Sequence, residues 1–336
     1  MANDDYAIVI GINDYPGMID APDHAGNLQG PVNDATAIHA WLTDPAKGGV
    51  DPQKATLIVS PRPLPQNFAL GNAQPVVQTI ENAFSGLTSL ADTKPPPVGR
   101  RLYVYMSGHG FAPERAKGAV FVADATKVST RHVFATAWLD WFYNAAYFDE
   151  LVLWLDCCMK FHFTVVPQAP SLARIQGNSS GARVFSAYSA KFKQESVEDE
   201  MPDGLFHGVF TYTLLQGLES AVDASGNITT ASLKQYLINR MKFNMPAKFK
   251  QIGTVSQEPD FGFDDSMVFV TGAPIPAKDV LLNGIPDGTK VDILGGNPSD
   301  IVASAVVQNG KVSLSLRPGV YAAQADGDST LHGFQV

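Results

Sequence analysis

Short apolar runs alternate along most of the chain with segments whose apolar residues recur every three to four positions. The runs lie at 6–12, 55–59, 101–106, 151–155 and 182–187, and they are typical of strands buried on both faces. The amphipathic segments begin near 33, 76, 134, 206 and 230, and they predict helices. A further strand at 267–270 is expected to close this region. Strands that alternate with helices predict an α/β fold with a mainly parallel sheet covered on both faces.

The pattern changes from Ala273 onward. Pro274 and Pro276 predict a linker, and short β-type runs follow at 280–282, 290–294, 301–307, 311–316 and 319–323. Asn309-Gly310 between two of these runs predicts a hairpin turn. We therefore expect two domains: an α/β domain over 1–272, and a small all-β domain over 273–336, immunoglobulin-like or similar, for docking or as a lid.

Two of the predicted strands run directly into reactive side chains. The strand at 101–106 leads into Ser107-Gly108-His109-Gly110, and the strand at 151–155 leads into Asp156-Cys157-Cys158. Parallel strands deliver their carboxyl ends to one edge of a sheet, where chemistry is expected. Cys158 follows His109 by 158 − 109 = 49 residues, close to the spacing of about 50 between histidine and cysteine in caspases. Either residue alone is weak evidence, since a buried cysteine is usually an inert apolar residue.

These two blocks resemble the catalytic blocks of the metacaspases, the caspase-like peptidases of bacteria, plants, fungi and protists. Other segments resemble that family in the same order, over about residues 5 to 272: they lie at 6–13, 28–35, 185–189, 194–198 and 208–215. The resemblance, closest to the prokaryotic metacaspases (orthocaspases), implies a cysteine endopeptidase. Its nucleophile is Cys158, two places after Asp156, and its acid is His109. The NH groups of Gly110 and Cys158 would hold the oxyanion.

The resemblance also implies specificity for Arg or Lys on the amino side of the cut. The first specificity pocket would use Asp156, Asp34 and Ser107, with Tyr188 and Ser189 as further substrate-binding residues. The expected substrates are therefore proteins and peptides with basic residues. For Asp34 a structural role stays open, because it or Asn33 could cap the amino end of the first helix.

The sequence departs from the metacaspase pattern after the nucleophile. Met159-Lys160-Phe161 replaces the usual His-Ser-Gly, and no Asp or Glu occurs from Met159 to Ala190. Calcium needs several oxygen ligands, so we expect little calcium activation, and we assign no metal and no cofactor. The stretch 167–181 is rich in Pro, Ser, Gly and Asn, which makes Arg174 a candidate self-cleavage site.

Composition narrows the class of partner. The chain carries 24 basic and 33 acidic residues, a net charge of −9, and no basic run, so nucleic acid is not expected as a partner. Two adjacent cysteines fit a reducing compartment. The acidic N-terminus lacks signal-peptide features, and no apolar run is long enough to span a membrane. We expect a cytoplasmic protein in a prokaryotic regulatory or defence setting, with a regulatory protein as a possible partner of the β domain.

Two alternatives from other functional classes remain. The chain could be a catalytically inactive caspase-like scaffold that binds partners, although a pure scaffold would need neither His109 nor Cys158. It could also be a nucleotide-handling α/β enzyme, but no Gly-rich phosphate loop follows the first strand. Labelling of Cys158 by a peptidyl electrophile would separate a peptidase from both.

Overall fold

The structure is a computed structural model that describes residues 4–18, 26–62, 69–160, 165–168, 170, 172, 181–252, 257–273, 277–295, 301–316 and 320–335. The chain divides into two compact units, Met1–Gly217 with Lys234–Met267, and Leu218–Leu233 with Val268–Val336. The expected boundary between residues 272 and 273 stays a prediction. The division lies close to it, and it also assigns 218–233 to the C-terminal unit.

A six-stranded sheet forms the centre of the first unit, in the order β12, β8, β7, β3, β1, β2. These strands are β1 (Asp5–Gly11), β2 (Ala55–Val59), β3 (Gly99–Ser107), β7 (Phe148–Asp156), β8 (Arg183–Tyr188) and β12 (Asp260–Asp264). The first five pair in parallel, whereas β12 is antiparallel to β8. The mainly parallel sheet is therefore confirmed, and its strands β1, β3 and β7 are almost fully buried.

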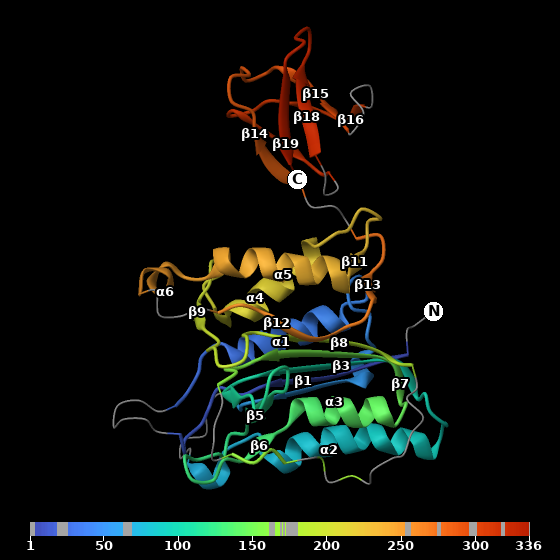
Figure 1. The fold of residues 1–336 in the computed structure, drawn as a ribbon, viewed down its shortest axis with the longest axis vertical. Coiled ribbons are helices and arrows are strands. Elements are labelled where there is room, and N and C mark those ends of the chain that lie inside the picture. The colour runs from blue at the N-terminus through green and yellow to red at the C-terminus, as the bar shows by residue number, and fades with distance from the viewer. Residues whose placement is uncertain are drawn as a thin grey trace. The chain divides into compact units, whose positions relative to one another are not determined.

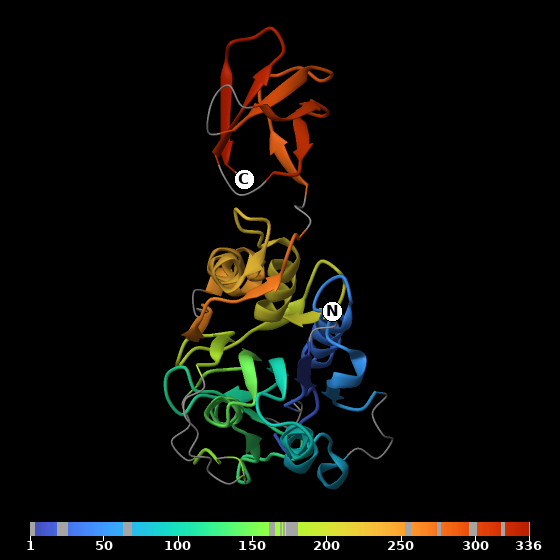
Figure 2. The ribbon, with the colours of Figure 1, turned by 90° about the vertical axis from the view of Figure 1, so that its right-hand side faces the viewer.

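Helices cover both faces of this sheet, as expected. The helices of the described chain are α1 (Pro31–Thr43), α2 (Val77–Thr88), α3 (Ala135–Asn144), α4 (Val209–Ser220), α5 (Thr230–Asn244) and α6 (Ala247–Ile252), with short 3₁₀ turns at Pro52–Lys54, Leu70–Asn72 and Ser89–Asp92. Figures 1 and 2 show α2 and α3 on one face and α1 on the other. Phe84 of α2 stacks on Trp138 of α3 with ring centroids 4.5 Å apart. Trp138 is thus a core residue. No helix in the described part of the chain has the length and apolarity needed to cross a membrane.

Two small sheets follow strands of the first unit in sequence. One contains β4 (Gly110–Phe111), β5 (Ala119–Phe121) and β6 (His132–Val133), and the other contains β9 (Glu198–Glu200) and β10 (Phe206–Gly208). β4 begins three residues after β3 ends, so the first small sheet starts at the carboxyl edge of the central sheet. Both small sheets contribute residues to the site described below.

The C-terminal unit contains the predicted β strands. β14 (Lys278–Leu281) pairs with β17 (Lys311–Leu314), and a second sheet has the order β16 (Ile301–Val306), β15 (Lys290–Leu294), β18 (Val320–Ala325), β19 (Leu331–Gln335). Asn309 and Gly310 both have positive φ, 53° and 70°, and a bridge between Gln308 and Lys311 closes the predicted turn. The flanking strands β16 and β17 belong to different sheets, so they do not pair as a longer hairpin. The segment 267–270, expected to close the α/β sheet, instead gives β13 (Val268–Val270), which pairs with β11 (Ile228–Thr229).

Candidate active site

The sheet register brings the two catalytic blocks together. β3 and β7 are neighbours, and Ser107 lies opposite Asp156 at their carboxyl ends. His109 and Cys158 each follow two residues later. Both residues line one cavity of about 110 Å³. The structure therefore places the imidazole and the thiol at the same site, as the two strand ends indicate.

His109 is oriented by two contacts that the sequence did not predict. Its Nε2 lies 2.7 Å from the carbonyl oxygen of Gly26, and its backbone NH donates to the Tyr15 hydroxyl at 3.0 Å. The Tyr15 ring packs against the imidazole with centroids 4.8 Å apart. A carbonyl can only accept, so in the neutral ring Nε2 carries the proton and Nδ1 is unprotonated. Nδ1 is thus the nitrogen able to accept a proton from a thiol.

The two cysteines lie in different environments. Cys157 is 1% exposed, and its Sγ lies 3.9 Å from the carbonyl oxygen of Ala119. Cys158 is partly exposed, and its Sγ lies 3.8 Å from the carbonyl oxygen of Ser196. Burial raises the pKa of both thiols, that of Cys157 well above its ordinary value. Cys158 is therefore the accessible sulfur, and at neutral pH it rests mainly as the thiol.

Position 110 accommodates only glycine, because a side chain there would collide with its neighbours. A Cβ at Gly110 would come within 2.5 Å of Cys157 Sγ and of the Ala119 carbonyl oxygen. The Phe121 NH donates to the His109 carbonyl, so Gly110 and Val120 form a non-hydrogen-bonded pair. The NH of Gly110 consequently points away from β5, which leaves it available to a ligand atom on its other side.

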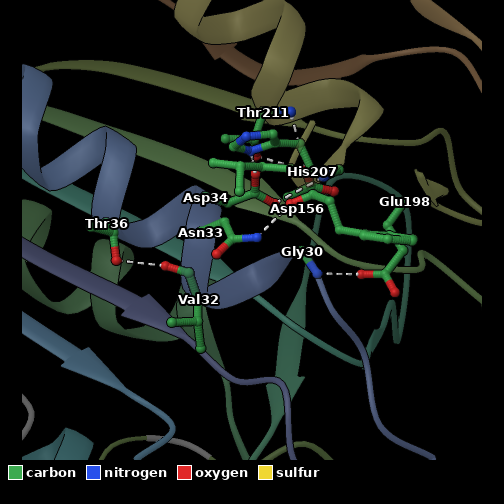
Figure 3. A network of polar contacts seen from close by, with 12 residues as sticks. Gly30, Val32, Asn33, Asp34, Thr36, Asp156, Glu198, His207 and Thr211 are labelled. Atoms are coloured by element: carbon green, nitrogen blue, oxygen red, sulfur yellow. Dashed lines mark hydrogen bonds and ion pairs between the residues drawn. The ribbon is translucent and has the colours of Figure 1, made fainter. Parts of the chain in front are cut away.

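Acidic side chains form one wall of the cavity. Its lining includes Asp34 from α1, Asp156 from β7 and Glu198 from β9, together with Ser107. Figure 3 shows how the three acids approach one another from these separate elements. No Lys or Arg occurs among the described residues that line the cavity. The wall is therefore suited to a cationic group.

The partners of Asp34 and Asp156 are not Lys or Arg. Asp156 accepts from the Ser196 hydroxyl at 2.7 Å, and from the hydroxyl and NH of Thr211 at 2.7 and 3.1 Å. Asp34 accepts from the Gly208 NH at 2.9 Å and lies 2.6 Å from Nδ1 of His207. Burial raises the pKa of Asp34 to about 7, and it also raises the pKa of Asp156.

The helix-cap alternative for Asp34 is wrong. α1 begins at Pro31 with Gly30 as its N-cap, so Asp34 lies inside the first turn. Its carboxylate contacts β10 residues and makes no bond to its own helix end. The N-cap expectation failed because Pro31, which suits a first helical position, starts the helix earlier.

Tyr188 and Ser189 do not line the cavity. Both are fully buried, and the Tyr188 hydroxyl donates to the carbonyl of Ala116 at 2.9 Å. The Ser189 hydroxyl accepts from the Cys157 NH at 3.1 Å and donates to the Cys157 carbonyl at 2.9 Å. The structure thus places them as supports of the strand ends, with Ser189 fixing the backbone next to Cys158. Arg174, the candidate self-cleavage site, lies outside the described residues.

The sequence analysis did not predict four residues that the structure places at the site: Tyr15, Ser196, Glu198 and His207. Glu198 accepts from the NH groups of Gln29 and Gly30, the nearer at 2.8 Å, and so ties β9 to the start of α1. The segments that hold Ser196 and Glu198 resemble the metacaspases, which was the one available clue. Within the described residues, no group of three or more His, Cys, Asp or Glu side chains is arranged to hold a metal ion.

Comparisons with known proteins identify the family of the chain. The family model described as "Caspase domain" matches residues 4–261. No curated protein sequence matches the chain significantly. Among solved structures, the crystal structure of caspase-1 from Spodoptera frugiperda is similar with a TM-score of 0.49 and 12% identity, over 80% of this chain and 91% of that one. Since the family model covers most of the chain, the protein belongs to the caspase-domain family of cysteine-type peptidases.

Proposed function

We propose that the protein is a metacaspase-like endopeptidase that cleaves polypeptides after Arg or Lys. The observation that carries this proposal is the wall of Asp34, Asp156 and Glu198 in the cavity that also holds His109 and Cys158. Carboxylates beside the nucleophile suit a guanidinium or ammonium group, whereas an acidic substrate side chain would meet like charges. Arg should be accepted at least as well as Lys, since its planar donors match a carboxylate.

The proposed reaction uses Cys158 as the nucleophile. Its sulfur attacks the peptide carbonyl carbon, and the thiol proton passes to Nδ1 of His109. The carbonyl oxygen becomes an oxyanion, which the NH groups of Gly110 and Cys158 would stabilise. His109 then gives the proton to the departing amine, and the C–N bond breaks to leave a thioester. Water hydrolyses the thioester, which restores the thiol and releases the carboxylate product.

The resting thiol makes His109 necessary in this scheme. Burial raises the pKa of Cys158, so the thiolate is scarce before substrate binds. The carbonyl of Gly26 holds Nε2, which keeps Nδ1 unprotonated in the neutral ring. The pair therefore works by transferring a proton during attack, without a preformed thiolate–imidazolium pair.

A panel of fluorogenic peptides tests this proposal. The peptides share one sequence and carry Arg, Lys, Asp or Asn at the cleaved position, and the matched control variants are Cys158→Ala and Cys157→Ala. We expect cleavage after Arg and Lys by the wild type and by Cys157→Ala, and none by Cys158→Ala. Preferred cleavage after Asp would contradict the acidic-pocket assignment. No cleavage, with no labelling of Cys158 by a peptidyl electrophile, would point to an inactive scaffold, which the family match does not favour.

A further inference from the structure

His207 lies behind the acidic wall and links it to the surface. The residue belongs to β10 and is 4% exposed. Its Nδ1 is 2.6 Å from Asp34 Oδ1, and its Nε2 is 3.1 Å from Asp203 Oδ2. Asp34 is completely buried, whereas the Asp203 side chain is 45% exposed. Figure 3 shows the ring directly against Asp34. The cavity wall is thus connected with solvent through Asp34, His207 and Asp203, in that order.

This arrangement favours an imidazolium. A neutral imidazole has one NH donor and one acceptor, so it can donate to only one of two carboxylates. The doubly protonated ring donates to both. Burial acts to lower the pKa of His207, but the hydrogen bond and charge of Asp34, together with Asp203, outweigh it and raise the pKa. The pair of Asp34 and His207 therefore retains a proton to a higher pH than a free imidazole does.

We propose that His207 is a specificity-determining residue, because its proton sets how much negative charge Asp34 presents to the cavity. While the pair holds the proton, Asp34 and His207 are together neutral, and the charge of the wall comes from Asp156 and Glu198. Loss of the proton adds one uncompensated negative charge next to the site of the substrate side chain. This inference rests on the proposed cleavage after basic residues and identifies the group that tunes it.

Within the described part of the chain, no Lys or Arg forms an ion pair with Asp34 or Asp203. Among the described residues, the only ion-pair partner of Asp34 or Asp203 is His207 itself. Asp199 of β9 lies opposite His207 and is paired with Lys248 of α6 at 2.6 Å. The ring of Tyr212 in α4 lies 5.9 Å away. Among the described residues, the titratable and charged groups around the pair are Tyr105, Asp156, Glu198, Asp199, Asp203, Tyr212 and Lys248.

The test compares two peptides that differ only at the cleaved position, one with Arg and one with citrulline, its uncharged isostere. The ratio of their kcat/KM values cancels the titration of His109 and Cys158, because both peptides use the same nucleophile. For the full-length wild type, we expect this ratio to rise by about tenfold as the pH increases from 5.5 to 8.5, the gain from one charge-assisted contact.

Two variants locate the effect. In His207→Gln, which removes the imidazolium, the buried Asp34 carboxyl must hold the proton itself, because burial raises its pKa and His207 no longer lowers it. The ratio should therefore rise only at a higher pH than in the wild type. In Asp203→Asn, which leaves the cavity wall intact and removes one support of the imidazolium, the rise should occur at lower pH than in the wild type. Because His207→Gln could fail to fold, the shift in Asp203→Asn is a second, independent criterion.

The possible results distinguish a failure of the role of His207 from a failure of the proposed cleavage after Arg or Lys. A wild-type ratio that stays flat with pH, or a rise at the same pH in Asp203→Asn as in the wild type, would overturn the role of His207 while leaving cleavage after Arg intact. Absence of cleavage after Arg at every pH, with Cys158 still labelled by a small electrophile, would overturn the proposed function itself.

Discussion

The strand β7 carries a buried carboxylate at each end, and the two have opposite surroundings. Glu150 near its start is 3% exposed, and Asp156 at its end is 4% exposed. Glu150 forms ion pairs with Arg100, Arg101 and Arg183. Among the described residues, the hydrogen-bond donors to Asp156 are uncharged, and they include the hydroxyl of Ser196 and the hydroxyl and NH of Thr211. Because Glu150 and Asp156 are almost equally buried, the two carboxylates differ in the charge of their partners and not in their exposure.

The register of the sheet places acidic and basic residues side by side near the amino ends of its parallel strands, called here the amino edge. Asp5 lies opposite Arg101, Arg101 opposite Glu150, and Glu150 opposite Arg183, across four parallel strands. Each carboxylate there is neutralised inside the protein. At the carboxyl edge, no guanidinium or ammonium group of a described residue pairs with Asp34, Asp156 or Glu198. This difference suits a role in the fold for the amino edge, and it supports the proposal that the carboxyl edge receives a cationic group of the substrate.

The largest effect is expected at the carboxyl edge from Cys158→Ala. Removal of the nucleophile should lower kcat by about 10⁴-fold or more, as in other enzymes with a covalent nucleophile, while the melting temperature changes little. Cys157→Ala is the matched control and should retain most activity, because the Cys157 thiol is buried against Ala119. Equal loss in both variants would reverse the assignment of the nucleophile.

At the amino edge, Glu150→Gln should reduce stability and spare the chemistry. The change leaves Arg101, which is 1% exposed, without its ion-pair partner. Breaking a buried pair in this way costs about 3–5 kcal/mol. Urea unfolding measures the loss, and kcat/KM corrected for the folded fraction should stay near the wild-type value. A specific loss of kcat in the folded variant would show that the two edges are not separate in role.

The matching change at the carboxyl end of β7, Asp156→Asn, should reduce activity more than stability. Asp156→Asn is expected to lower kcat/KM for an Arg peptide by about 10- to 100-fold, the value of a charge-assisted hydrogen bond. The same variant should cleave the citrulline peptide nearly as well as the wild type does. Equal losses on the two peptides would instead indicate that Asp156 only maintains the shape of the site.

The smallest effect concerns the pH dependence of stability. Burial raises the pKa of Asp156 in the folded protein above its ordinary value of 3.8. The folded state thus holds this proton more tightly than the unfolded state, so the contribution of Asp156 to stability falls as pH rises from about 4 through the raised pKa. The free energy of unfolding of Asp156→Asn should decline less over that range. A steeper decline than in the wild type would contradict the stated environment of the carboxylate.

The sequence was most informative where burial leaves a local pattern. The apolar runs of β3 and β7 predicted buried parallel strands, and their last residues led directly to His109 and Cys158. β12 was missed, since Asp260–Asp264 has only two apolar residues, separated by a glycine and flanked by one Asp at each end. A strand of that kind has no continuous apolar run to reveal it.

The site was harder to predict where residues arrive through tertiary contacts. Tyr15 reaches His109 from a loop after β1, over 94 positions of sequence. His207 meets Asp34 across 173 positions, from a strand of only three residues. No local periodicity encodes such pairs. Asp34 could be assigned to the pocket only through the family resemblance, because its own sequence context fits a helix start equally well.

The most direct test of the central claim is a crystal structure of the protein after reaction with a peptidyl electrophile that carries Arg at the cleaved position. We expect a covalent bond to Cys158 Sγ and the guanidinium within about 3 Å of a carboxylate oxygen of Asp34, Asp156 or Glu198. A bond to Cys157, or a guanidinium directed into solvent with the three carboxylates uncontacted, would contradict the account.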